Sequence, residues 1–296
     1  MMDNLNATRD MEGNARAGYL VKYTPKKIMK CGWTYISNLS QERSEMENNC
    51  KVIRMEVDVV DLDNSLVIVE DLALLKKGSY VCVSNVHMCM EAFDSPEFAS
   101  IVNSADLTIP DGKPIFWAQK LLRHTDAEQV RGQDIMNALC ASAGTRTLNI
   151  GLYGGNSDEL LTVVKNKLRA SYPDISITYA YSPPFRTLTA AEDADVIRQI
   201  NLAKVNVLFV GIGCPKQERW MAEHKGEINC VMLGVGAAYD FIAGSKKYAP
   251  RWMQQIGMEW FFRLCSEPKR LWRRYLSTNP RFIWHFGKQL IKHRLE

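Results

Sequence analysis

The feature that most constrains the fold of this 296-residue chain is a regular alternation of strand-like and helix-like segments in its second half. Short apolar runs rich in β-branched residues predict strands over residues 147–152, 175–181, 205–210 and 230–235. Amphipathic patterns predict helices between them, over residues 158–170, 191–203 and 215–224. Strands and helices that alternate through short loops form right-handed crossovers, so we expect an α/β fold with a mainly parallel sheet and helices on both faces.

The first half shows the same kinds of segment from about residue 51 onward. Apolar runs predict a strand or hairpin over residues 52–60 and strands over 80–83 and 107–109, each followed by a helix-like pattern. Residues 1–50 are polar and rich in Asn and Glu, and we expect them to be poorly ordered. The chain thus divides into an N-terminal extension, 1–50, an α/β core, 51–250, and a C-terminal appendage, 251–296.

The appendage differs from the core in composition. Residues 251–296 hold ten Lys or Arg against three Asp or Glu, a net charge of +7 in a chain of net +4, so residues 1–250 carry −3. A buried helix face is predicted by apolar residues at helical spacing: Trp252, Met253, Ile256, Trp260, Phe261 and Leu264. The arginines that are interspersed with Trp and Tyr suit phosphates or an anionic membrane surface instead. Nucleic acid is disfavoured as a partner, because the core is net negative and has no nucleic-acid motif.

Three observations bear on the cellular location. The longest nearly uninterrupted apolar stretch, residues 205–213, is far shorter than the roughly 20 residues that span a bilayer. The N-terminus lacks the basic and apolar regions of a signal peptide. The eight cysteines form no CxxC pair, which is typical of free thiols in a reducing compartment. We therefore expect a cytoplasmic protein.

Three glycine-rich turns follow predicted strands, where ligands bind in parallel α/β sheets. Their candidate phosphate-binding residues are Gly154, Gly213 and Gly236, since glycine lets a ligand approach the backbone and the next helix offers free N–H groups. For the first turn, a purely structural role as a tight connection fits equally well. The second turn also brings Gln217 and Glu218 to the same crevice. None matches GxGxxG, which disfavours a nicotinamide-dependent dehydrogenase.

Asp111 is the strongest candidate for a catalytic residue. The string Pro110-Asp111-Gly112 is compatible with a β-turn whose Asp caps the next helix. However, Asp111 follows one predicted strand, and Asn85 and His87 follow another. That placement favours a general base beside polar groups that orient a substrate.

Two residue groups could suggest a metal site. Asp61-Leu-Asp63 matches a DxD pattern, but it directly precedes a helical pattern, where Asp61 is expected to cap the helix. Cys82, His87 and Cys89 lack zinc-ligand spacing and a second ligand pair. We therefore expect no metal and no cofactor. GxSxG, HExxH and Walker A motifs are absent, which disfavours esterase, metalloprotease and P-loop chemistry.

Several longer strings resemble one family. They are Gly211-Ile-Gly-Cys-Pro-Lys-Gln217-Glu218, Leu233-Gly-Val-Gly236-Ala-Ala-Tyr-Asp240, and Met258-Glu-Trp-Phe-Phe-Arg263 followed by Glu267-Pro-Lys-Arg270. With Asn85 and Asp111 upstream, they are similar to the WecG/TagA/CpsF glycosyltransferase family (glycosyltransferase family 26) over about residues 52–275. The resemblance implies a Rossmann-like core and a helical appendage that completes the site and meets the membrane.

The resemblance also implies an activity. Members are inverting, metal-independent transferases of bacterial surface polysaccharide synthesis. They move a sugar, often of N-acetylmannosamine type, from a UDP-sugar donor to a polyprenyl-diphosphate-linked acceptor. Such an enzyme would be peripheral, at the inner face of the cytoplasmic membrane.

Carried over residue by residue, the resemblance makes Asp111 the catalytic base and Asn85 the polar residue of the first loop. The expected UDP-sugar-binding residues lie in the glycine turns and the appendage: Gly154, Gly213, Gln217, Glu218, Gly236, Asp240, Arg263, Arg270 and Arg273. The chain departs from the family at Val83, where Thr is common, and at Gln129, a commonly basic position with Arg131 nearby. These departures concern sugar or acceptor contacts rather than the reaction class.

Two other classes of protein fit part of the sequence. A nucleotide-binding regulatory module would keep the glycine turns but would not require Asp111. A membrane-surface scaffold would keep the appendage but would not require Gln217. The sequence leaves the donor sugar, the acceptor glycan and the oligomeric state open.

Overall fold

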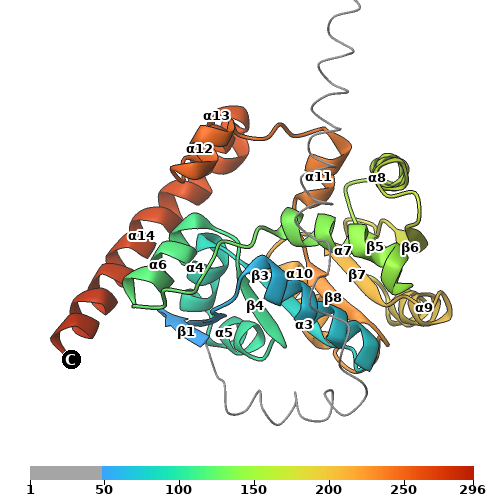
Figure 1. The fold of residues 1–296 in the computed structure, drawn as a ribbon, viewed down its shortest axis with the longest axis horizontal. Helices are drawn as coiled ribbons and strands as arrows, with labels where there is room; N and C mark the ends of the chain where they lie inside the picture. Colours follow the sequence, from blue (N-terminus) through green and yellow to red (C-terminus); the bar gives the residue numbers. More distant parts are fainter. Residues whose placement is uncertain (1–48) are drawn as a thin grey trace, which may run out of the picture.

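The computed structural model describes residues 49–296, so the expected poor order of residues 1–50 lies almost entirely outside the described part. Its centre is a six-stranded parallel sheet in the order β4-β3-β8-β7-β5-β6. The strands are β3 (Tyr80–Ser84), β4 (Leu107–Pro110), β5 (Asn149–Gly154), β6 (Ser176–Tyr181), β7 (Val207–Gly211) and β8 (Val231–Gly234). The expected Rossmann-like α/β class is confirmed (Figure 1).

Helices cover both faces of this sheet, because successive side chains of a strand point to opposite faces. In β3, Tyr80 and Cys82 belong to one apolar core, and Val81 and Val83 to the other. The first core includes side chains of α4 (Val86–Asp94), α5 (Pro96–Asn103), α9 (Ala190–Leu202) and α10 (Lys216–Glu223). The second includes side chains of α3 (Leu62–Leu75), α7 (Gly132–Arg146), α8 (Asp158–Ser171) and α11 (Ala238–Ala243).

A small antiparallel hairpin precedes the sheet. It consists of β1 (Asn49–Val52) and β2 (Met55–Asp58), and helix α6 (Lys113–Leu121) packs against it. After the hairpin, Asp61 accepts a hydrogen bond from the Asn64 N–H at 2.7 Å and begins α3. The expected helix-capping role of Asp61 is therefore confirmed.

The appendage is helical, as expected, with α12 (Arg251–Gln255), α13 (Glu259–Ser266) and α14 (Pro268–Leu295). Helix α14 packs against α4, and its Phe282 and Phe286 are buried in the first core. Gln289 joins α14 to the hairpin turn, since its Nε2 donates to the Lys51 carbonyl at 2.6 Å and its Oε1 accepts from the Ile53 N–H at 2.7 Å.

The buried face predicted over residues 252–264 is wrong: α12 and α13 contain no buried residue, and Trp252, Ile256 and Trp260 are exposed, since α13 faces the open cavity rather than the core. The appendage buries apolar side chains through α14 instead.

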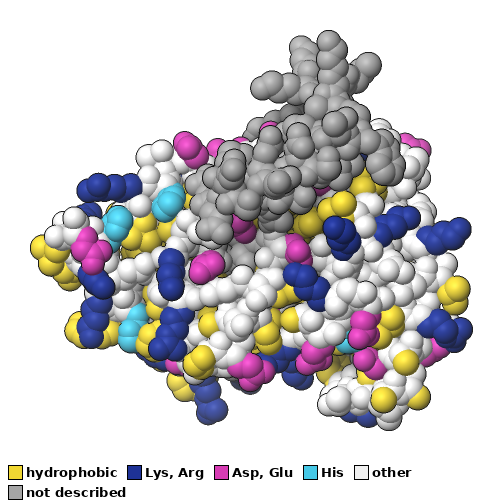
Figure 2. Space-filling view, turned by 90° about the horizontal axis from the view of Figure 1, so that it is seen from below, with side chains coloured by type: hydrophobic (Ala, Val, Ile, Leu, Met, Phe, Trp, Pro, Cys, Tyr) yellow, Lys and Arg dark blue, Asp and Glu magenta, His cyan; other side chains and the backbone are white. Residues whose placement is uncertain are grey.

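The outer face of α14 is exposed and mixed in character. Trp284, Ile291 and Leu295 are exposed apolar side chains. At the end of the molecule that α14 forms, at the left of Figure 2, Lys and Arg side chains alternate with hydrophobic ones. Within residues 49–296, no helix combines the length and the apolar character needed to cross a membrane.

Candidate active site

A cavity of about 1710 Å³ runs along the carboxyl ends of the parallel strands and is closed on the other side by the appendage. Loops that follow all six strands line it, from Asp111 after β4 to the loop after β6. Pockets for a single small ligand measure roughly 300–1,000 Å³. The cavity therefore has room for two substrates at once.

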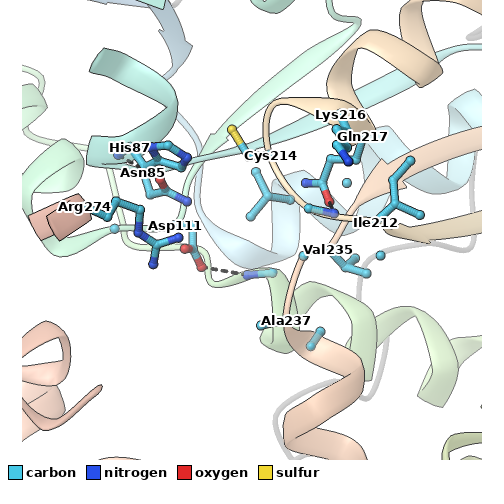
Figure 3. A pocket seen from close by; sticks show the side chains of 18 of the residues that line it. Asn85, His87, Asp111, Ile212, Cys214, Lys216, Gln217, Val235, Ala237 and Arg274 are labelled. Atoms are coloured by element: carbon cyan, nitrogen blue, oxygen red, sulfur yellow. Dashed lines mark hydrogen bonds between the residues drawn. The ribbon is translucent and has the colours of Figure 1, made fainter. Parts of the chain in front are cut away.

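Asp111 lies where the strand end, α6 and α7 meet. Its Oδ1 accepts a hydrogen bond from the Gly132 N–H at 2.9 Å, drawn in Figure 3. Its carbonyl accepts from Gln129 Nε2 at 2.6 Å. Within residues 49–296, no hydrogen bond is made by the other carboxylate oxygen, Oδ2. The helix-capping alternative does not hold, because Gly112 is the N-cap residue of α6 and no side chain caps this helix.

The surroundings of Asp111 raise the pKa of its carboxyl group to about 6. Burial is the largest cause, and the nearby Glu259 carboxylate adds to it. The Gly132 N–H, Arg263 and Arg131 act in the opposite direction. A carboxyl group with a pKa near 6 is ionised at neutral pH yet basic enough to accept a proton from a hydroxyl in a transition state.

Asn85, His87 and Arg274 gather beside Asp111 (Figure 3). The Asn85 side chain caps α4, since its Oδ1 accepts from the N–H groups of His87 and Met88 at 3.0 and 3.2 Å. The Asn85 Nδ2 group takes no part in this capping. Burial and the Arg274 charge lower the pKa of His87, which favours the neutral imidazole.

The turn after β7 faces this group across the cavity (Figure 3). Gly213 has a φ of +89°, which favours glycine, and a Cβ there would meet no atom within 4 Å. The Gly213 N–H donates to Gln217 Oε1 at 3.2 Å, and Gln217 Nε2 donates to Glu218 Oε1 at 2.7 Å. Gly213 and Gln217 line the cavity, whereas Glu218 is fully buried beneath it. Glu218 therefore supports the turn from below.

The other two glycine turns differ from each other. Gly236 lines the cavity with open space on its Cβ side. Gly154 is not among the lining residues; a Cβ there would lie 2.6 Å from the Gly211 carbonyl, so it allows β5 and β7 to approach. Its neighbour Gly155 lines the cavity instead. Gly154 therefore has the purely structural role that was the alternative for the first turn.

The predicted appendage arginines take different positions. Arg263 lines the cavity with its guanidinium 5.7 Å from the Phe241 ring centroid. Arg270 also lines it and donates to Glu267 Oε2 at 2.6 Å. Arg273 is not among the lining residues and lies over the Trp272 ring, while its neighbour Arg274 faces the cavity.

Asp240 lines the cavity beside a cation. Its Oδ2 accepts from Lys246 Nζ at 2.5 Å, and Lys246 also lies 3.8 Å from Glu267 Oε2 on the appendage. Asp240 is therefore paired within the protein, and this ion-pair chain connects the core to the appendage. Lys246 adds a positive charge that sequence analysis did not identify.

No three His, Cys, Asp or Glu side chains come together at metal-ligand distances in the described residues. Cys82 and Cys89 are buried, and Cys89 Sγ donates to the Val52 carbonyl.

Arg274 and Glu259 were not among the predicted site residues, although both line the cavity. Arg274 could not be separated from Arg273 without the phase of α14, because adjacent residues of a helix point about 100° apart. Glu259 lay within a quoted motif, but only the folded appendage brings it toward Asp111.

The fold and the site together define an α/β protein in which a buried carboxyl group, Asp111, lies beside a cavity lined in part by Arg and Lys side chains. A model of the WecG/TagA/CpsF family of glycosyl transferases matches residues 50–296, so the chain belongs to that family and is a glycosyltransferase.

Two curated relatives illustrate the family. The N-acetylglucosaminyldiphosphoundecaprenol N-acetyl-beta-D-mannosaminyltransferase of Bacillus subtilis (strain 168) is 30% identical over 206 residues, which cover 68% of this chain and 77% of the relative. The enzyme of the same name from Staphylococcus aureus (strain MW2) is 26% identical over 251 residues, which cover 82% and 96%.

Proposed function

We propose that this enzyme transfers an N-acetylmannosamine-type sugar from a UDP-sugar to a polyprenyl-diphosphate-linked sugar. The observation that supports this most is Asp111, a carboxylate with one free oxygen and a raised pKa, in a cavity large enough for two substrates. The names of the relatives specify a diphosphate-linked lipid acceptor for those enzymes.

In the proposed reaction, Asp111 accepts the proton of the acceptor hydroxyl. The hydroxyl oxygen bonds to the anomeric carbon while the bond between that carbon and the UDP oxygen breaks. A single displacement of this kind inverts the configuration at the anomeric carbon. UDP leaves with the bonding electrons.

The leaving diphosphate requires positive charge. Arg263, Arg270, Arg274 and Lys246 all line the cavity, and the Gly213 and Gly236 turns expose backbone there. Guanidinium groups pair well with phosphate oxygens. These groups support a reaction without a divalent metal.

The test is to incubate the full chain with a panel of UDP-sugars and a polyprenyl-diphosphate-linked N-acetylglucosamine, with EDTA present. We expect UDP release and a mass gain of the acceptor by one N-acetylhexosamine. Release of UDP without acceptor modification would contradict the proposal. Activity that is lost in EDTA and restored by Mg²⁺ would overturn its metal-independent part.

We also propose that α14 binds the inner face of the cytoplasmic membrane through its exposed aromatic and basic side chains. Truncation near Pro280 is a poor test, since it also removes the buried Phe282 and Phe286. The double variant Lys288→Glu, Lys292→Glu instead reverses charges on an exposed face. Because each basic residue near an anionic surface contributes about 1 kcal/mol, we expect vesicle binding at low salt to weaken at least about tenfold.

Sedimentation with vesicles that contain anionic lipid measures this binding. A matched double variant, Lys76→Glu, Lys77→Glu, reverses two charges after α3 and should bind as the wild type does. Equal binding of wild type and the α14 variant would exclude this face as the membrane contact.

A further inference from the structure

Part of the cavity, here called the apolar arm, is lined by apolar side chains of α6 and α14. Helix α6 contributes a single stripe: Pro114, Trp117, Ala118 and Leu121 line the cavity at i, i+3, i+4 and i+7. These positions share one face of an α-helix. Trp117 and Leu121 are 42% and 47% exposed, so they are not used to fill the core.

Helix α14 contributes the rest of this lining, and the character of its lining residues changes along the helix. Near its start, the cations Arg270 and Arg274 line the cavity, and the polar residues Thr278 and Asn279 follow. Farther along, the lining residues are Phe282, Ile283 and Phe286, of which Ile283 is 70% exposed. At 1.5 Å per residue, the step from Arg274 to Phe286 covers about 18 Å. The cavity therefore passes from a cationic region to an apolar one along a single helix.

Aromatic side chains pack together where the appendage meets α6. Gly257 has a φ of +75°, and a Cβ there would lie 2.3 Å from the Trp117 ring, so the backbone packs directly on the indole. Trp260 of α13 meets Tyr275 of α14 edge to face, with centroids 6.0 Å apart. All four residues line the cavity. Exposed apolar side chains concentrated along one groove mark a binding surface.

We propose that this apolar arm, between α6 and α14, binds the first isoprene units of the polyprenyl acceptor. The inference rests on the proposed function, because it takes its occupant from the diphosphate-linked lipid. The order of charges agrees with such a molecule: sugar at Asp111, diphosphate at the arginines, and hydrocarbon along Trp117, Leu121 and Ile283. The apolar arm belongs to the same cavity as Asp111. A surface that only contacts the membrane would not have to join that cavity.

The kinetic test compares two acceptors in the same detergent, one with a long polyprenyl chain and one with a short, water-soluble alkyl chain. Leu121→Glu should raise the KM for the long-chain acceptor at least about tenfold, since burial of a Leu side chain contributes 1.5–3 kcal/mol. The same variant should leave the KM for the donor and for the short-chain acceptor unchanged. Leu74→Glu changes a similarly exposed leucine of α3 outside the cavity, and it should leave all three KM values unchanged.

The variant Ile291→Glu distinguishes lipid binding in the apolar arm from contact of α14 with a membrane. Ile291 is 64% exposed on α14 but does not line the cavity. Detergent assays with this variant should match the wild type. If Leu121→Glu and Ile291→Glu raise the KM for the long-chain acceptor equally, the assignment of the apolar arm is wrong. It is also wrong if Leu121→Glu leaves the KM for the long-chain acceptor unchanged.

A second measurement does not depend on transfer. A polyprenyl diphosphate with a photoreactive diazirine in its first isoprene unit should label residues 113–121 of the full-length chain. Labelling confined to residues 287–296 would contradict binding in the apolar arm, even if sugar transfer is observed. Conversely, labelling of α6 without transfer to either acceptor would support binding in the apolar arm and reject the proposed function.

Discussion

At the scale of single residues, Asp111 can be tested by a change that preserves its shape. Asp111→Asn keeps an oxygen to accept the Gly132 N–H but removes the negative charge that accepts a proton. We expect turnover to fall by roughly two to four orders of magnitude, the usual effect of losing a general base. UDP binding and the melting temperature should not decrease. A variant with near-wild-type turnover would show that another group is the base.

The pKa of the same carboxyl group predicts the pH dependence. Burial raises the pKa of Asp111 to about 6, above its ordinary value of 3.8. The protonated form cannot accept a proton, so activity should be lost as pH falls through about 6. The measurement is kcat/KM for the acceptor from pH 5 to 8. Glu259→Gln removes a nearby negative charge and should move this acid limb to lower pH; an unchanged limb would argue against Asp111 as the titrating group.

At the scale of elements, the rotation of α14 distinguishes two adjacent arginines. Arg274 faces the cavity, whereas Arg273 lies over Trp272 outside it. A hydrogen bond to a charged group contributes about 1.5–3 kcal/mol. Arg274→Ala should therefore lower kcat/KM about 10- to 100-fold, and Arg273→Ala should change it less than about threefold. Steady-state kinetics of both purified variants decide this, and the reverse order would mean that Arg273 turns inward when substrate binds.

Most elements of the sheet could be predicted because the strands are short buried runs between turn residues. Helices α5 and α7 were missed for different reasons. Helix α5 has only eight residues and begins at Pro96, which by itself suggests a turn. Helix α7 is rich in Ala, Gly and Ser and shows little helical periodicity, because several of its sides are buried.

The site was predictable only where the sequence itself places a residue at a strand end. Four predicted residues follow the carboxyl ends of parallel strands and line the cavity, as expected: Asn85, Asp111, Gly213 and Gln217. The partners of Asp111 come from residue 129 onward and from the appendage, more than 15 positions away. No local pattern records such contacts, since they depend on how α7 and α13 dock.

At the scale of the whole molecule, the docking of the appendage on the core can be weakened at one residue. Gly257→Ala would place a Cβ 2.3 Å from Trp117 at a φ of +75°. Overpacking of this kind costs about 1–3 kcal/mol. We expect lower activity and faster proteolysis between α11 and α13, with the melting of the core little changed.

Gly287→Ala is the matched control, because a Cβ there meets nothing within 4 Å. It should retain full activity and wild-type resistance to protease. If Gly257→Ala behaves in the same way, the contact with Trp117 does not determine how the appendage docks.

The division of the cavity between core and appendage has a thermodynamic consequence. A substrate that contacts both walls strengthens their association, and anything that holds the appendage against the core strengthens substrate binding by the same factor. If vesicles hold α14 in its docked position, the donor should bind more tightly in their presence. Vesicle affinity measured with and without donor must then change by the same ratio as donor affinity measured with and without vesicles.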